Sequence, residues 1–205
     1  MYHTLKRYLD WLLSGLALLA LSPALALVWV AVRISMGSPV LFRQERAGYK
    51  GKPFFVLKFR SMNSATDASG KLLQDEDRLT SFGQFLRKTS LDELPQFFNV
   101  MKGEMSLVGP RPLYMRYISR YSEEQKKRLL VRPGITGLAQ VNGRNAISWE
   151  ARFALDVDYV TRASFGLDVA ILFKTIFRVL RSEGISQEGK VTMDEFMGNI
   201  SNSSK

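Results

Sequence analysis

Hydrophobic residues are most concentrated near the start of the chain, where the segment from Trp11 to Val32 contains no charged residue. A helix of this length extends roughly 33 Å, close to the hydrocarbon thickness of a bilayer. Ser22 and Pro23 fall at its centre, and a proline there removes a helical hydrogen bond and bends the helix. Each arm is then about 17 Å long, too short to span. The pattern therefore predicts a re-entrant helix.

Basic residues flank this segment on both sides. Lys6 and Arg7 precede it and Arg33 follows it, which favours a hairpin with both ends on the cytoplasmic face. Two alternatives stay open, a simple spanning anchor and a cleaved signal peptide. The signal peptide is disfavoured because the apolar run continues to Trp29 without an obvious small-residue cleavage site.

The remaining pattern predicts short strands followed by helices. Two apolar and aromatic runs, 40–43 and 54–59, are separated by a glycine-proline turn signal and indicate a β-hairpin. The polar stretch 63–77 indicates an exposed loop, and a helical period begins at Leu79. Residues 165–180 form a basic amphipathic pattern that suits either a membrane interface or a protein core.

These elements predict a mainly helical α+β protein. We expect residues 1–35 to form the membrane helix-break-helix, residues 36–198 to form one domain, and residues 199–205 to be a disordered polar tail.

Charge and composition narrow the function. The chain has 205 residues and a formal net charge of +10, so its field favours phosphate-rich partners. It has no cysteine and one histidine, His3, which argues against thiolate chemistry, a histidine triad or a zinc site. No nucleic-acid module is recognisable, but a non-catalytic protein that binds anionic membrane surfaces stays an alternative.

An acidic pair, Asp92 and Glu93, lies in this basic chain just before Pro95. Because proline is tolerated only in the first turn of a helix, the pair is expected at a helix N-terminus, which stabilises negative charge. A capping box between Ser90 and Glu93 explains one acid, but it leaves Asp92 unexplained. Adjacent carboxylates cannot readily flank a sugar as the two acids of a glycosidase do.

Two glycine-punctuated loops follow, and each contains an arginine suited to phosphate. Arg111 is held between two prolines in the loop 103–112, and a rigid guanidinium binds phosphate in a bidentate manner. The second loop, 131–145, contains three glycines and Arg144. It matches no nucleotide-binding fingerprint, so its glycines alone are weak evidence.

In this order the motifs resemble the bacterial sugar transferases, the small, single-domain type of monotopic phosphoglycosyl transferase. The resemblance covers nearly the whole chain. It runs through Lys6-Arg7, Ser22-Pro23, Lys58-Phe59-Arg60-Ser61-Met62, Ser90 to Gln96, Met105 to Pro112 and Arg132 to Arg144, and reaches Asp156 and Tyr159.

The resemblance implies a reaction at the cytoplasmic face of the bacterial inner membrane. A sugar 1-phosphate passes from a UDP-sugar to undecaprenyl phosphate, UMP is released, and Mg²⁺ is required. It implies a monotopic protein with both termini cytoplasmic, acting in the cytoplasmic leaflet, compatible with a homodimer and without a nucleic-acid partner.

The resemblance also implies residue roles. Asp92 is the nucleophile that forms a covalent phosphosugar in a ping-pong mechanism, and Glu93 assists through a proton or as a metal ligand beside Asp92. Phosphate or nucleotide binding falls to four residues, Arg87, Arg111, Arg144 and Asp156. Asp158, close to Asp156, is an alternative that the sequence leaves open.

Two segments resemble the branch of the family that uses UDP-N,N'-diacetylbacillosamine to begin glycoprotein oligosaccharides. These are residues 142–149 and 184–192, although the acidic Asp194 and Glu195 depart from that branch. The expected donor is therefore UDP-N,N'-diacetylbacillosamine, with another UDP-sugar for capsule, O-antigen or exopolysaccharide as the alternative.

Overall fold

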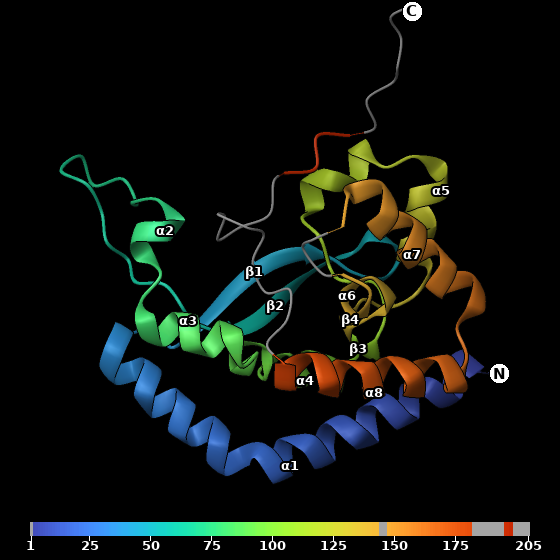
Figure 1. Ribbon diagram of the computed structural model, residues 1–205, viewed down its shortest axis with the longest axis horizontal. Coiled ribbons are helices and arrows are strands. Elements are labelled where there is room, and N and C mark those ends of the chain that lie inside the picture. The colour runs from blue at the N-terminus through green and yellow to red at the C-terminus, as the bar shows by residue number, and fades with distance from the viewer. Residues whose placement is uncertain (1, 144–146, 182–194, 199–205) are drawn as a thin grey trace, which may run out of the picture.

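The computed structural model describes residues 2–143, 147–181 and 195–198 of the chain. A long helix lies along one side of a compact body that is built from short helices and two small sheets (Figure 1). The expected mainly helical α+β fold is confirmed. The polar tail after residue 198 and Arg144 lie outside the described residues, as does the segment 184–192.

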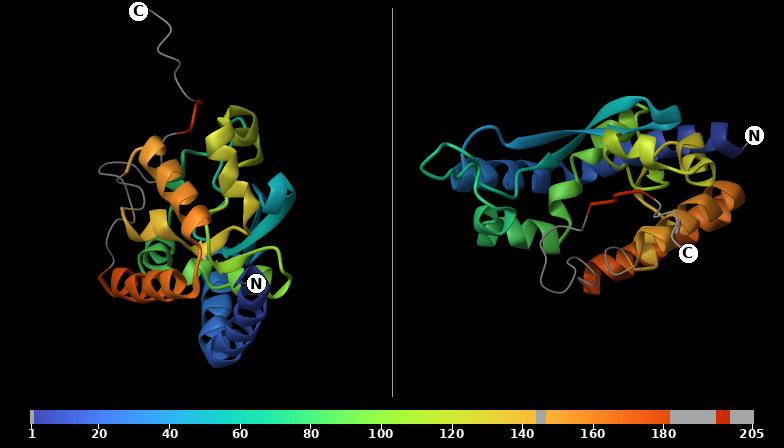
Figure 2. Two further views of the ribbon diagram at one scale, coloured as in Figure 1. Left: turned by 90° about the vertical axis from the view of Figure 1, so that its right-hand side faces the viewer. Right: turned by 90° about the horizontal axis from the view of Figure 1, so that it is seen from above.

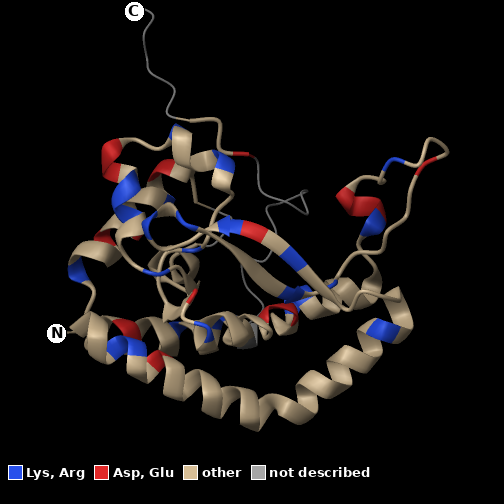
Figure 3. Cartoon of the chain, turned by 180° about the vertical axis from the view of Figure 1, so that it is seen from behind, with Lys and Arg blue, Asp and Glu red and all other residues tan. Residues whose placement is uncertain are grey.

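Helix α1 (Tyr2–Met36) is the one helix in the described ranges that is long and apolar enough to cross a membrane. It continues through Pro23, so the predicted break is a bend within one helix (Figure 1). Ser22 Oγ donates to the Leu19 carbonyl at 2.8 Å, a local bond that often accompanies helix bending. Figure 3 shows charged residues gathered near the start of α1, a basic residue near its end and none along its middle.

Both arms of α1 contact the same body. Asp10 and Ser14 are the buried residues of the first arm, and Val28 and Val32 are those of the second. Val28 and Val32 pack in a core cluster with Leu86. The bend therefore follows the surface of the body rather than carrying one arm away from it.

The predicted hairpin is formed by β1 (Leu41–Ala47) and β2 (Pro53–Phe59), which pair antiparallel. Two elements follow, α2 (Asp75–Arg78) and α3 (Ser81–Lys88). Thr80 caps α3 by accepting a hydrogen bond from the Gly83 N–H at 2.9 Å. The expected exposed loop lies between β2 and α3, with α2 as its one helical turn.

A second, parallel pair of strands was not predicted. It joins β3 (Ser106–Val108) to β4 (Gly134–Thr136). The pair packs against α1, α4 (Gln96–Met101) and α8 (Phe165–Arg181). Helices α6 (Leu138–Val141) and α7 (Trp149–Arg162) follow it in the chain, and α5 (Glu123–Lys126) lies farther out (Figure 1). Strands of three residues are too short to produce a clear alternating pattern.

The first turn of α8 meets the first turns of α1, where Tyr2 and Lys6 both donate to Asp168, and Figure 2 shows the two helices diverging from there. One face of α8 packs Ile171 into the core, and large apolar side chains on the rest of the helix remain exposed: Phe165, Val169, Phe173, Ile176 and Phe177. Exposed leucines of α1 add to the apolar surface of the molecule, and exposed apolar surface of this extent is typical of a membrane or protein interaction site.

Candidate active site

The acidic pair lies in a one-turn 3-10 helix, Leu91–Glu93, between α3 and α4. Pro95 is the N-cap of α4, so the pair precedes that helix instead of starting it. Ser90 has a left-handed backbone (φ 58°) and makes no side-chain cap. The capping box is therefore absent, and Glu93 has other partners.

Two cations hold the Glu93 carboxylate. Lys58 Nζ on β2 donates to Glu93 Oε1 at 2.6 Å, and Arg111 Nη2 donates to the same oxygen at 2.8 Å. Burial raises the pKa of Glu93, but Arg111 and Lys58 outweigh it, so the pKa falls well below its ordinary value. Glu93 is thus a fixed anion.

Asp92 is in the opposite situation. It is 7% exposed, and among the described residues no hydrogen bond or ion pair holds its carboxylate. Burial raises its pKa to about 6 and the charge of Glu93 adds to the rise, while Lys58 and two arginines oppose it. Near neutral pH Asp92 is therefore mainly an unpaired, partly desolvated carboxylate, the state of an activated oxygen nucleophile.

Arg87 and Arg111 approach the pair from different elements. Arg87, in the last turn of α3, donates from Nε to Ser61 Oγ at 2.9 Å and lies close enough to Asp92 to lower its pKa. Arg111 lies in the loop after β3, and its side chain is 38% exposed. Three cations, Lys58 included, therefore surround two carboxylates and leave a positive charge for a phosphate.

Asp156 does not reach the acidic pair. It is 1% exposed, accepts a hydrogen bond from Arg128 Nε at 3.0 Å and forms an ion pair with Arg128 Nη2 at 2.9 Å. Arg128 also donates to the Arg111 carbonyl at 2.6 Å. The buried pair therefore fixes the backbone that presents Arg111. Asp158 is paired with Arg162 at the surface.

The glycines of the two loops serve backbone packing. A Cβ on Gly134 would lie 2.1 Å from the Gly109 nitrogen, and one on Gly137 would lie 2.1 Å from the Gly109 carbonyl oxygen. The Gly109 N–H donates to the Thr136 carbonyl at 2.8 Å. These glycines let the two loops touch, and this contact orients the Pro110-Arg111 segment.

The sequence brought forward Asp92, Glu93, Arg87 and Arg111, and the structure places all four together. It missed the contributions of Lys58 and Arg128. Lys58 stood in a motif of the resemblance, and its place inside an otherwise apolar strand is the local signal that could have marked it as a site residue. Nothing in the pattern around Arg128 distinguishes it from the neighbouring surface lysines.

The carboxylates of Asp92 and Glu93 could supply some, but not all, of the ligands of a divalent cation such as Mg²⁺. Among the described residues no group of three or more histidine or acidic side chains is arranged to hold a metal ion. Mg²⁺ commonly uses one or two carboxylates and completes its shell with substrate phosphates and water. Asp92 and Glu93 fit that kind of shared site.

Comparison with known proteins gives a consistent match. Residues 1–182 match the family described as bacterial sugar transferase. An uncharacterized sugar transferase, EpsL, of Bacillus subtilis (strain 168) is 53% identical over 195 residues, which are 95% of this chain and 96% of that protein.

Two longer relatives have names that state a reaction. The undecaprenyl-phosphate galactose phosphotransferase of Salmonella typhimurium is 42% identical over 197 residues, 88% of this chain and 41% of that protein. The UDP-glucose:undecaprenyl-phosphate glucose-1-phosphate transferase of Escherichia coli (strain K12) is 42% identical over 184 residues, 85% of this chain and 40% of that protein.

Proposed function

This chain belongs to the bacterial sugar transferase family, and from that premise we propose that it transfers a sugar 1-phosphate from a UDP-sugar to undecaprenyl phosphate. The names of two relatives support the donor and acceptor classes. The observation that carries the mechanism is the asymmetry of the acidic pair. Glu93 is held by Lys58 and Arg111, whereas Asp92 is buried and unpaired among the described residues.

In the first half-reaction an oxygen of Asp92 attacks the phosphorus that bears the sugar. A bond forms between Asp92 and that phosphorus, the bond to the bridging diphosphate oxygen breaks, and UMP leaves with the electron pair. Arg111 and Arg87 stabilise charge on the phosphoryl oxygens. Glu93 holds Lys58 and Arg111 in place, which is a positioning role.

In the second half-reaction an oxygen of undecaprenyl phosphate attacks the same phosphorus. The bond to Asp92 breaks, its carboxylate is restored, and undecaprenyl diphosphate sugar is the product. Two steps suit a water-soluble donor and a lipid acceptor, because the two substrates need not occupy the site together.

We expect Asp92 and Glu93 to be the residues that would hold Mg²⁺. A bound Mg²⁺ would neutralise negative charge on the phosphate oxygens of the donor. The residues of the chain would still provide the nucleophile and the guanidinium groups.

The sugar remains a prediction. UDP-N,N'-diacetylbacillosamine is expected from residues 142–149 and 184–192, most of which lie outside the described ranges. The two named relatives are transferases of galactose and glucose phosphates. The donors to compare are therefore UDP-N,N'-diacetylbacillosamine, UDP-galactose and UDP-glucose.

A re-entrant α1 is part of the same proposal. The helix bends at Pro23, and both of its arms contact the body, so a crossing helix would have to release one arm. Both ends would then lie at the cytoplasmic face, where undecaprenyl phosphate and UDP-sugar meet. Because the chain has no cysteine, His3→Cys and Ser35→Cys can be labelled singly. Both should react with an impermeant maleimide from the same side, and labelling from opposite sides would contradict the hairpin.

The reaction is tested by isotope exchange. Purified protein, Mg²⁺ and each UDP-sugar are mixed with labelled UMP and without undecaprenyl phosphate. A covalent phosphosugar predicts label in the UDP-sugar, and adding the lipid should then give product and net UMP. Label entering only when the lipid is present would show a direct transfer without the Asp92 intermediate.

Two variants assign the nucleophile. Asp92→Asn should abolish exchange and the mass-spectrometric phosphosugar adduct. Asp77→Asn, which alters an exposed acid of α2, should retain both. No exchange and no UMP release with any donor would instead favour the non-catalytic membrane-binding alternative.

A further inference from the structure

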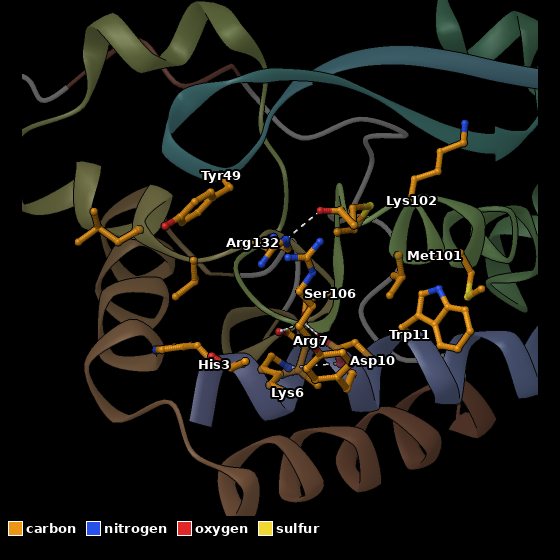
Figure 4. Close-up of a pocket in the computed structure, with 18 of the residues that line it drawn as sticks. His3, Lys6, Arg7, Asp10, Trp11, Tyr49, Met101, Lys102, Ser106 and Arg132 are labelled. Carbon is orange, nitrogen blue, oxygen red and sulfur yellow. Dashed lines mark hydrogen bonds and ion pairs between the residues drawn. The ribbon is translucent and has the colours of Figure 1, made fainter. Parts of the chain in front are cut away.

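A cavity lies away from the acidic pair, lined by residues of α1, α4 and two loops. It has a volume of about 810 Å³ and opens between the first turns of α1, the end of α4 and the segment after α5 (Figure 4). Asp92, Glu93, Arg87 and Arg111 are not among its lining residues. The cavity is therefore distinct from the proposed catalytic site.

Two arginines meet in this cavity at Gly103. Arg132 Nε donates to the Gly103 carbonyl at 2.8 Å, and a Cβ on Gly103 would lie 3.8 Å from Arg7 Nη2. Figure 4 shows both guanidinium groups pointing into the cavity. Neither arginine forms an ion pair with any residue that the structure describes. Two uncompensated like charges that converge in a cavity favour an anion between them.

The one carboxylate of the lining does not neutralise them. Asp10 is 9% exposed, accepts from Ser106 Oγ at 2.6 Å and lies 3.5 Å from Lys6 Nζ. Lys6 also pairs with Asp168. These partners saturate Asp10, so the cavity keeps a net positive charge.

The other part of the lining is apolar and continues into the membrane segment. Trp11 is 54% exposed and lies beside Met101 (Figure 4). Arg7 precedes Trp11 by one helical turn, about 6 Å along the axis. With the apolar part of α1 in hydrocarbon, Arg7 lies at the level of the headgroups, where basic residues attract anionic lipids.

We propose that this cavity binds the phosphate of an anionic phospholipid between Arg7 and Arg132, with its first acyl carbons against Trp11 and Met101. The volume lies within the range of small-molecule sites. The bound lipid would fix the depth of the first arm of α1. The inference is independent of the proposed reaction, because the lining excludes the acidic pair.

The test measures lipid retention by native mass spectrometry of the full chain in detergent with added phosphatidylglycerol. A hydrogen-bonded charge pair of about 1.5–3 kcal/mol predicts about a 10- to 150-fold rise in apparent Kd for Arg7→Gln and for Arg132→Gln. Arg33→Gln, at the other end of α1 and exposed, is the matched control and should stay within about twofold. Arg7→Gln removes no hydrogen bond or ion pair of the described residues, so it should fold normally.

Further arms identify the ligand. Phosphatidylcholine with the same acyl chains should bind at least about tenfold more weakly, and neither inorganic phosphate nor UMP should displace phosphatidylglycerol at equal concentration. Equal retention by wild type and both glutamine variants would overturn the proposal. Equal binding of phosphatidylcholine, or displacement by inorganic phosphate, UMP or undecaprenyl phosphate, would contradict the assigned ligand.

Discussion

Replacing Asp92 by asparagine should make the protein more stable while it removes catalysis. The pKa of Asp92 is raised from 3.8 to about 6, first by burial and then by the charge of Glu93, against the opposing charge of Lys58. Because the folded pKa lies above the unfolded one, ionisation of Asp92 opposes folding. At pH 7.5 the ionisation of Asp92 lowers the free energy of unfolding by about 3 kcal/mol. At pH 4.5 the reduction is only about 1 kcal/mol, because the carboxyl is protonated in the folded state at that pH.

An asparagine side chain has nearly the same shape and carries no charge, so it avoids this cost. The wild-type protein should therefore recover stability relative to Asp92→Asn as the pH falls through 6 toward 3.8. For a chain of this size 1 kcal/mol corresponds to about 2–4 °C in Tm. The variant should melt about 6–12 °C higher than wild type at pH 7.5 and only about 2–4 °C higher at pH 4.5.

The assay is thermal unfolding of both proteins in one detergent, without donor or metal, at several pH values. Comparing the proteins at equal pH subtracts most of the effects of other titrating groups. Asp77→Asn, on the exposed surface of α2, should shift Tm by no more than about 2 °C at any pH. An Asp92→Asn gain that is absent at pH 7.5, or identical at both pH values, would refute the view that Asp92 is a costly buried anion.

Further predictions concern the groups around the pair. The rate of UMP release by wild type should fall about tenfold per pH unit below about pH 6, because only ionised Asp92 attacks, and a flat profile down to pH 5 would exclude this. Arg111→Gln should lower the rate of UMP release about a hundredfold or more in steady-state assays, whereas loss of substrate affinity alone would place Arg111 outside the transition state. Asp156→Asn should lower the free energy of unfolding by about 3–5 kcal/mol, because Arg128 is left buried without its anion. An unchanged free energy of unfolding would contradict that pairing. Gly134→Ala should lower the free energy of unfolding by about 2 kcal/mol or more, because its Cβ would meet the Gly109 nitrogen. Gly166→Ala in α8, which has open space around it, should unfold like wild type.

Features that depend on neighbouring residues could be predicted from the sequence. The hairpin followed from two apolar runs and a turn signal, and the bend of α1 followed from Pro23 in an apolar helix. The presentation of Arg111 followed from its flanking prolines. In each case the physical cause acts within a few residues, so the local pattern contains it.

Features that depend on residues far apart in the chain could not be predicted from the sequence. Lys58 is 35 positions from Glu93, and Arg128 is 28 positions from Asp156. The glycines at 134 and 137 were as compatible with a phosphate cradle as with close loop packing, and only the position of Gly109 decides between them. Adjacency in the chain gives no information about such partners.

The acidic pair shows why adjacency can even mislead. In a 3-10 helix successive side chains project about 120° apart, so Asp92 and Glu93 face different surroundings although they are neighbours. Glu93 reaches the cations of β2 and of the Arg111 loop, and its charge is thereby neutralised. Asp92 turns toward a buried region where nothing described pairs with it. An α-helical capping box would have made Glu93 a local structural residue; the 3-10 turn instead makes it the anchor of Lys58 and Arg111. The two neighbouring carboxylates therefore differ because the 3-10 turn that follows the left-handed Ser90 directs them into different surroundings.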